Sequence, residues 1–161
     1  MNNNDIFTED NTILLINKNK IKFNKYIKFE KKGNYKLLLL NNNKLENLSS
    51  LFSNCNEILK IKFFKINSQN VFRLDSMFEG CSSLISIDVT KFNTQNVVDM
   101  NSMFKKCSSL TSIDVSKFYT QNVTSMKSMF EDCLSLTLNK VSKSNINTFK
   151  KIVDKNLLKL N

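Results

Sequence analysis

Cysteine recurs at one fixed interval along this chain. The four cysteines stand 26 residues apart, with no irregular spacing between them. A period of 20–50 residues is typical of stacked repeats, in which each unit buries its apolar face against the next. Residues one repeat apart then stack as ladders that mainly serve packing, which argues against catalysis. The ladder consists of Cys55, Cys81, Cys107 and Cys133.

Other residues follow the same register. Residues 77–102 and 103–128 share the pattern M-F-x-x-C-S-S-L-x-S-I-D-V-[ST]-K-F-x-T-Q-N-V, and residues 51–76 carry a degraded copy. A partial repeat at 35–50 precedes these three full repeats, and a degenerate one at 129–143 follows them. With 161 residues, the chain has the length of one domain. We therefore predict a single repeat domain over 1–161.

Each repeat combines two hydrophobic periods. Val97, Met100, Met103, Phe104 and Cys107 recur at helical spacing. Asn96 would cap that helix at its start. The next segment alternates, with Ile113 and Val115 inward and Ser112, Asp114 and Ser116 outward. The fold class predicted is an α/β repeat, with short helices on one face and a parallel sheet on the other.

Two end segments lack the repeat motif and are predicted to be caps, because the ends of a repeat array must be covered. Residues 12–34 resemble a short β-meander, with a strand at 12–16, a turn at 17–20 and alternation from Ile21. Residues 144–161 place their apolar side chains on one face of a helix. The lysines of that helix leave open a second interpretation, in which it lies on a membrane surface.

The repeat motif resembles the BspA-type leucine-rich repeat, in the form abundant in mycoplasma surface lipoproteins. The resemblance covers residues 48–138 strongly and 35–47 weakly. It implies a leucine-rich-repeat solenoid that acts in adhesion or in binding host proteins at the cell surface. Secretion signals begin with a basic segment and an apolar run, and neither is visible here, which favours an intracellular location instead. No stretch has the length of a membrane span.

The regular spacing of cysteine and asparagine along the chain is compatible with several roles. Buried, reduced thiols are expected, because stacked side chains point the same way and give poor disulfide geometry. A metal site is not expected without a C-x-x-C pair or histidine. Asparagines at the repeat positions 70, 96 and 122 would cap helices or bond loop backbone in a neighbouring unit.

The outward positions of the predicted strands are the candidate binding site, because they are free of core packing. One column reads Lys36, Lys62, Asp88, Asp114, Lys140; a second reads Asn34, Lys60, Ser86, Ser112; a third reads Leu38, Phe64, Thr90, Ser116. From these columns, the predicted binding residues are Lys60, Lys62, Ser86, Asp88, Ser112 and Asp114. A solvated polar face without a ligand is the alternative interpretation.

The residue types favour a binding protein over an enzyme. The chain has no histidine and no glycine-rich phosphate loop, so neither catalytic residues nor cofactors are predicted. The net charge is +10, but the repeat body is nearly neutral and has a single arginine, which argues against nucleic acid as a partner. The leading hypothesis is a non-enzymatic module that binds an unidentified protein, and the alternative is an intracellular scaffold or assembly protein. The oligomeric state is not predicted.

Overall fold

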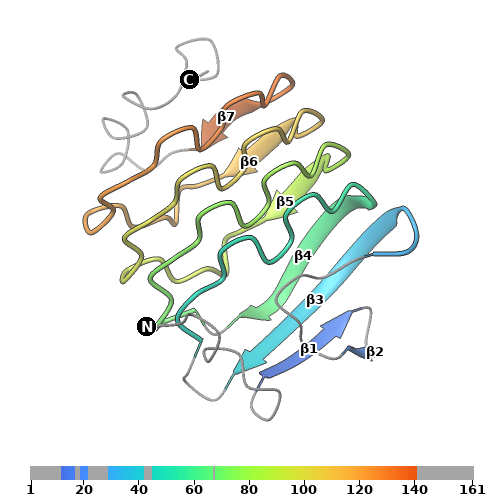
Figure 1. Cartoon of the computed structure of the whole chain (residues 1–161), viewed down its shortest axis with the longest axis horizontal. Helices are drawn as coiled ribbons and strands as arrows, with labels where there is room; N and C mark the ends of the chain where they lie inside the picture. The colour runs from blue at the N-terminus through green and yellow to red at the C-terminus, as the bar shows by residue number, and fades with distance from the viewer. Residues whose placement is uncertain (1–11, 17–18, 22–28, 42–44, 67, 141–161) are drawn as a thin grey trace.

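The structure is a computed structural model of the whole chain, and it describes residues 12–16, 19–21, 29–41, 45–66 and 68–140. A seven-stranded sheet runs through these residues in the order β2-β1-β3-β4-β5-β6-β7 (Figure 1). The strands are β1 (Thr12–Ile16), β2 (Asn19–Ile21), β3 (Gly33–Asn41), β4 (Ile58–Ile66), β5 (Ser86–Asp88), β6 (Ser112–Asp114) and β7 (Thr137–Lys140).

Strands β3 to β7 are parallel, and most of them pair with the 26-residue offset of the sequence. Lys60 pairs with Ser86, and Ser86 pairs with Ser112. The offset already holds between β3 and β4, where Tyr35 pairs with Ile61. Identical positions of successive repeats therefore lie beside one another, and the units follow one another across the sheet from β3 to β7 (Figure 1).

The first edge of the parallel strands is covered by an antiparallel pair. β1 runs against β3 over its whole length, from Thr12 beside Asn41 to Ile16 beside Leu37. β2 then pairs with the outer side of β1. The strand expected at 12–16 is present, and the second one begins two residues before Ile21. Residues 144–161, where a capping helix is predicted, and the end of the degenerate repeat lie outside the described residues.

The sequence predicts a short helix in each repeat, but the described residues contain no helix, and this part of the prediction is wrong. Residues 101–106 form consecutive turns instead. Met103 and Lys105 donate their N–H groups to carbonyls three residues back, as turns do. Met100, Ser102, Phe104 and Lys106 donate theirs to carbonyls of the following repeat, which a helix would need for itself.

Left-handed residues make this turn arrangement possible. The φ angles of Ser102 and Lys106 are 54° and 61°, and the equivalent Ser76 and Gly80 have 55° and 73°. Two left-handed residues four positions apart in each unit prevent an α-helix from propagating. This arrangement still returns the side chains to one side after three or four residues, so apolar residues show helical spacing without a helix.

The core lies between the sheet and the turns and repeats its contacts from unit to unit. Phe52, Phe78, Phe104 and Phe130 form a stack with ring centroids 5.4, 5.5 and 5.6 Å apart and planes within 8° of parallel. Phe63 of β4 meets the stack edge-on from the sheet side, 6.3 Å from Phe78. All five rings are buried, so the stack joins the repeats along the direction in which they follow one another.

Candidate functional site

The candidate site is the outward face of the parallel strands. Alternation along each strand decides which residues reach it: Ile87 of β5 and Ile113 of β6 are buried, whereas Ser112, the neighbour of Ile113 on β6, is exposed. Lys60 and Lys62 of β4 are also exposed, while Ser86, Asp88 and Asp114 are half-buried. All six predicted binding residues therefore lie on one side of the sheet, as the alternation predicts.

The register arranges these residues in two rows across the strands. The first row corresponds to the predicted column that begins at Asn34, and the second row to the one that begins at Lys36. The first row runs from Asn34 through Lys60, Ser86 and Ser112 to Thr137. The second row places Lys62 between Lys36 and Asp88, and Asp114 beside Lys140. In the third predicted column, Thr90 is exposed and Ser116 half-buried. The positions of the Leu38 and Phe64 side chains are not described.

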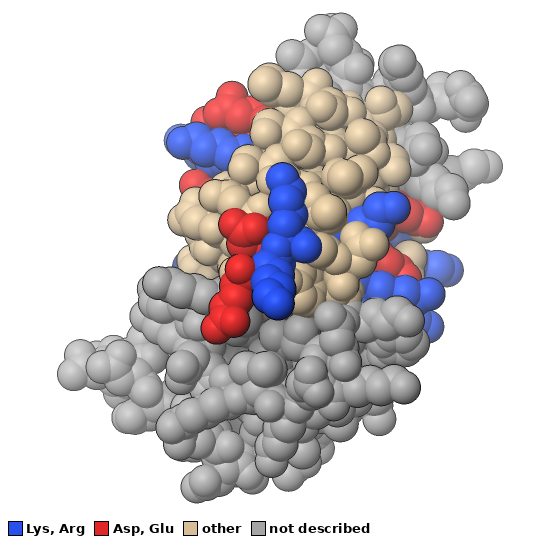
Figure 2. All heavy atoms as spheres, turned by 90° about the vertical axis from the view of Figure 1, so that its right-hand side faces the viewer, with Lys and Arg blue, Asp and Glu red and all other residues tan. Residues whose placement is uncertain are grey.

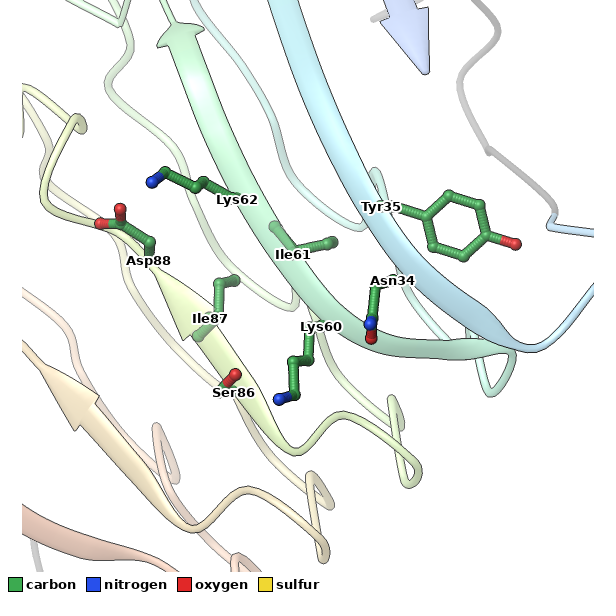
Figure 3. Close-up of a pocket in the computed structure, with 8 residues that line it drawn as sticks. All are labelled: Asn34, Tyr35, Lys60, Ile61, Lys62, Ser86, Ile87 and Asp88. Carbon is green, nitrogen blue, oxygen red and sulfur yellow. The ribbon is translucent and has the colours of Figure 1, made fainter. Parts of the chain in front are cut away.

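A shallow hollow of about 470 Å³ lies over the first ends of β3, β4 and β5. Figure 3 shows how its side chains are arranged: the head group of Lys62 points toward Asp88, and that of Lys60 points toward Ser86. The Tyr35 ring points away and packs on Phe29, with ring centroids 4.4 Å apart. The hollow therefore contains four of the six predicted residues, and it lacks Ser112 and Asp114.

Asp88 and Asp114 have a second role that the sequence analysis missed. Each ends a strand and accepts a hydrogen bond at 3.0 Å from the backbone N–H two residues later, at Thr90 and Ser116 respectively. The Thr90 hydroxyl adds a bond of 2.6 Å to the same Asp88 oxygen. The hydrogen bonds from Thr90, and to a smaller extent the charge of Lys62, hold the pKa of Asp88 below its usual value. The D-x-[ST] spacing in the repeats at 77–102 and 103–128 is the sequence signal for these turns.

The cysteine ladder is buried, as predicted, and none of its four thiols forms a disulfide. Cys81, Cys107 and Cys133 donate S–H hydrogen bonds to the carbonyls of Phe52, Phe78 and Phe104 at 3.0, 3.1 and 2.9 Å. Burial raises the pKa of Cys81 and Cys133 to about 12 and that of Cys55 to about 11, and it raises that of Cys107 as well. The thiols are therefore protonated structural groups at neutral pH. Among the residues that the structure describes, no group of His, Cys, Asp or Glu could hold a metal ion.

The asparagine ladder bonds neighbouring backbone, which is one of its two predicted roles. The side-chain amide of Asn96 donates to the carbonyl of Gln69, and that of Asn122 donates to the carbonyl of Gln95, both at 2.7 Å. Each bond reaches back into the preceding repeat. Because no helix follows these residues, the capping role is wrong.

Two further polar features were not predicted from the sequence. A buried column of Ser68, Thr94 and Thr120 lies inside the return loops. Two of its hydroxyls accept hydrogen bonds from the next repeat: the Asn93 N–H donates to Ser68 at 2.7 Å, and the Tyr119 N–H donates to Thr94 at 2.6 Å. The recurring [ST]-Q-N triplet is the sequence signal for this column.

The second feature is an ion-pair network around the single arginine of the chain. Arg73 bonds Asp75 through Nε at 2.8 Å and Asp99 through Nη2 at 3.2 Å. It stands in a line of single-residue parallel bridges from Asn47 through Arg73 and Asp99 to Ser125. The arginine therefore links two repeats, and its guanidinium is used within the protein.

Charges of both signs lie side by side on the surface. Figure 2 shows one face where basic side chains are adjacent to acidic ones and a broad area carries no charge. Lys105 and Glu131, one repeat apart, form another such pair at 2.6 Å. Among the described residues, none forms a helix with the length and hydropathy of a membrane span.

These observations define a repeat protein whose 26-residue units join through a parallel sheet. The family model described as "Mycoplasma protein of unknown function, DUF285" matches residues 46–157, and the chain belongs to this family. The family is part of the BspA-like group of repeat proteins, as the sequence resemblance implied. No curated protein and no solved structure shows significant similarity to the chain.

Proposed function

We propose that this protein is a non-enzymatic binding module of the leucine-rich-repeat type, which recognises a protein partner through the outward face of β3 to β7. The finer fold assignment, a solenoid, is part of this proposal. It is supported by the parallel strands one repeat apart and by the asparagine amides that bond the preceding unit.

One observation carries the functional proposal. Side chains of the first row reach the solvent and are not used in the contacts that join neighbouring repeats in the described part of the chain. Cysteine, phenylalanine, asparagine and threonine at their repeat positions all contact a neighbouring unit. By contrast, the Ser112 side chain is exposed and belongs to none of these contacts. Stacked repeats offer such extended surfaces to their partners. The mixed charge of the second row suits a protein better than a polyanion, since complementary charge fixes the register of a protein partner.

The resemblance to surface proteins supports a location outside the cell membrane as part of the same proposal. Brief trypsin treatment of intact source cells tests it. Loss of the protein from intact cells, with a cytoplasmic marker preserved, would support surface display. Protection from trypsin until the cells are lysed would instead support the intracellular scaffold.

Affinity capture followed by quantitative mass spectrometry tests the binding face. Ser112→Arg places a long cation in the middle of the first row, between Ser86 and Thr137. Gln95→Arg is the matched control, because Gln95 is also exposed but lies in a turn. Both variants should fold, since exposed substitutions usually change stability by about 0.5 kcal/mol or less.

We expect Ser112→Arg to lose the captured partner and Gln95→Arg to retain it. Equal capture by the two variants would refute the assignment of the sheet face. Self-association that survives in both variants, without another captured protein, would favour the scaffold.

A further inference from the structure

The hollow contains one lysine that is neutralised and one that is not. Lys62 pairs with Asp88 in the sheet register, its head group points toward the carboxylate, and its charge contributes to the lowered pKa of Asp88 (Figure 3). Lys60 pairs with the uncharged Asn34 and Ser86. Within the described part of the chain, Lys60 takes part in no ion pair. The hollow therefore carries one net positive charge, located at Lys60.

We propose that Lys60, with Asn34 and Ser86, binds a carboxylate side chain of the protein partner, an aspartate or a glutamate. This inference rests on the proposed function. An ammonium group has three donors, and an amide and a hydroxyl add further donors, while an ionised carboxylate only accepts. Hydrogen bonds between a cation and a carboxylate are stronger than neutral ones.

The two rows differ in charge, and this difference favours Lys60 as the position that meets the acidic residue. In the second row, Lys62 already faces the carboxylate of Asp88, and Asp114 lies beside Lys140, so charges of both signs are neighbours there. The first row lies two residues away along the strands, about 6.7 Å. Apart from Lys60, the members of that row bear no charge: Asn34, Ser86, Ser112 and Thr137.

A carboxylate fits this site better than a phosphate group. Phosphate recognition usually uses bidentate arginine or several cations, because the group carries more than one charge. The single arginine of the chain already bonds Asp75 and Asp99. A single net charge in the hollow matches a single carboxylate.

An NMR titration with acetyl-hexaglutamate amide tests the site, and the glutamine hexapeptide serves as the neutral comparison. We expect the glutamate peptide to shift the backbone resonances of residues 34, 60 and 86, and the glutamine peptide to shift none of them. Lys60→Gln should weaken binding about two- to fivefold, the contribution of one exposed charge pair. Lys60→Arg should retain binding, because it keeps the charge. Lys117→Gln, which removes an equally exposed lysine elsewhere, should also retain it.

Three results would overturn the carboxylate assignment. Equal weakening by Lys60→Gln and Lys117→Gln would show non-specific attraction to lysine. Tighter binding of inorganic phosphate than of the glutamate peptide at the same three residues would assign a different anion. If wild type binds no glutamate peptide while Ser112→Arg still abolishes partner capture, the sheet face remains the binding surface and only the carboxylate site is wrong.

Discussion

The buried thiol of Cys81 should make the fold sensitive to alkaline pH. Its side chain is fully buried and donates to the Phe52 carbonyl, and burial raises its pKa to about 12. In the unfolded chain a cysteine thiol has a pKa of about 8.5. A group with a raised folded pKa contributes stability that is fully present below its unfolded pKa. That stability is lost as the pH rises from about 8.5 toward 12.

The size of the loss follows from the difference between the two pKa values. Above pH 8.5 the unfolded state has released the proton and the folded state still holds it, so the free energy of unfolding falls by about 1.4 kcal/mol per pH unit for this thiol. At pH 10 the loss is about 2 kcal/mol. That is a large part of the 5–15 kcal/mol by which a domain is typically stable.

Urea unfolding of wild type and Cys81→Ala at pH 7 and pH 10 isolates this contribution. At pH 7 the alanine variant should be less stable, by about 1–2 kcal/mol, because it loses buried volume and a hydrogen bond. At pH 10 wild type alone pays the ionisation cost of this thiol, so the difference should shrink to near zero or reverse. Cys81→Ser, whose hydroxyl does not ionise, should show the same pH dependence as alanine. An unchanged difference between wild type and Cys81→Ala at the two pH values would refute the reasoning.

Four further substitutions test the turns, the core and the strand ends. Gly80→Ala should lower the free energy of unfolding by about 1–2 kcal/mol, since the φ of Gly80 is 73°. Lys106→Gly, at the equivalent left-handed position, should leave that free energy unchanged or raise it by up to about 1 kcal/mol, and thermal unfolding of the two variants checks the opposite signs. Phe104→Ala should cost about 3–5 kcal/mol in chemical unfolding because it interrupts the ring stack, and a cost under about 1 kcal/mol would contradict a continuous stack. Asp88→Asn should be less stable than wild type at pH 7, and the difference should shrink as the pH falls below about 3.9, because a lowered carboxyl pKa contributes stability above the unfolded value that is lost as the pH falls through the folded one; a difference that stays constant in urea titrations from about pH 7 to about pH 3 would exclude this role for the charge.

The sheet was predictable because its determinants are local and repeated. The 26-residue interval brings Lys60 beside Ser86, and two-residue alternation places Ile87 inside and Asp88 outside. Neither inference needs knowledge of the long-range contacts. The outward face could therefore be read from residue spacing alone.

The turn side was not predictable in the same way, because two backbones give one hydrophobic spacing. Consecutive turns with left-handed residues at Ser102 and Lys106 return side chains to one side as a helix does. Serine and lysine give no warning of this conformation, whereas Gly80 at the equivalent position does. Hydrogen bonds between units, such as that from Phe104 to Met129, decide the outcome and have no signature in a single repeat.

The turn roles of Asp88 and Asp114 change how the face is interpreted. The sequence suggested carboxylates available to a partner, but each already accepts the backbone N–H two residues later. Reversing either charge would disturb a strand end as well as the surface. Ser112→Arg and Lys60→Gln avoid that turn contact and therefore report on binding alone.

The lengths of the strands indicate where a partner would gain most of its contacts. β3 and β4 have nine residues each, whereas β5 and β6 have three each. A strand of three residues offers one or two outward side chains, while a strand of nine offers four or five. The part of the sheet formed by β4 and β5 contains one of the long strands, the hollow, and the lysine that has no ion pair among the described residues. A partner centred on Lys60 would therefore use the repeat at 51–76 for recognition and the nearly identical units at 77–128 mainly for support. The repeat at 51–76 is the one of the three full repeats that departs most from the motif.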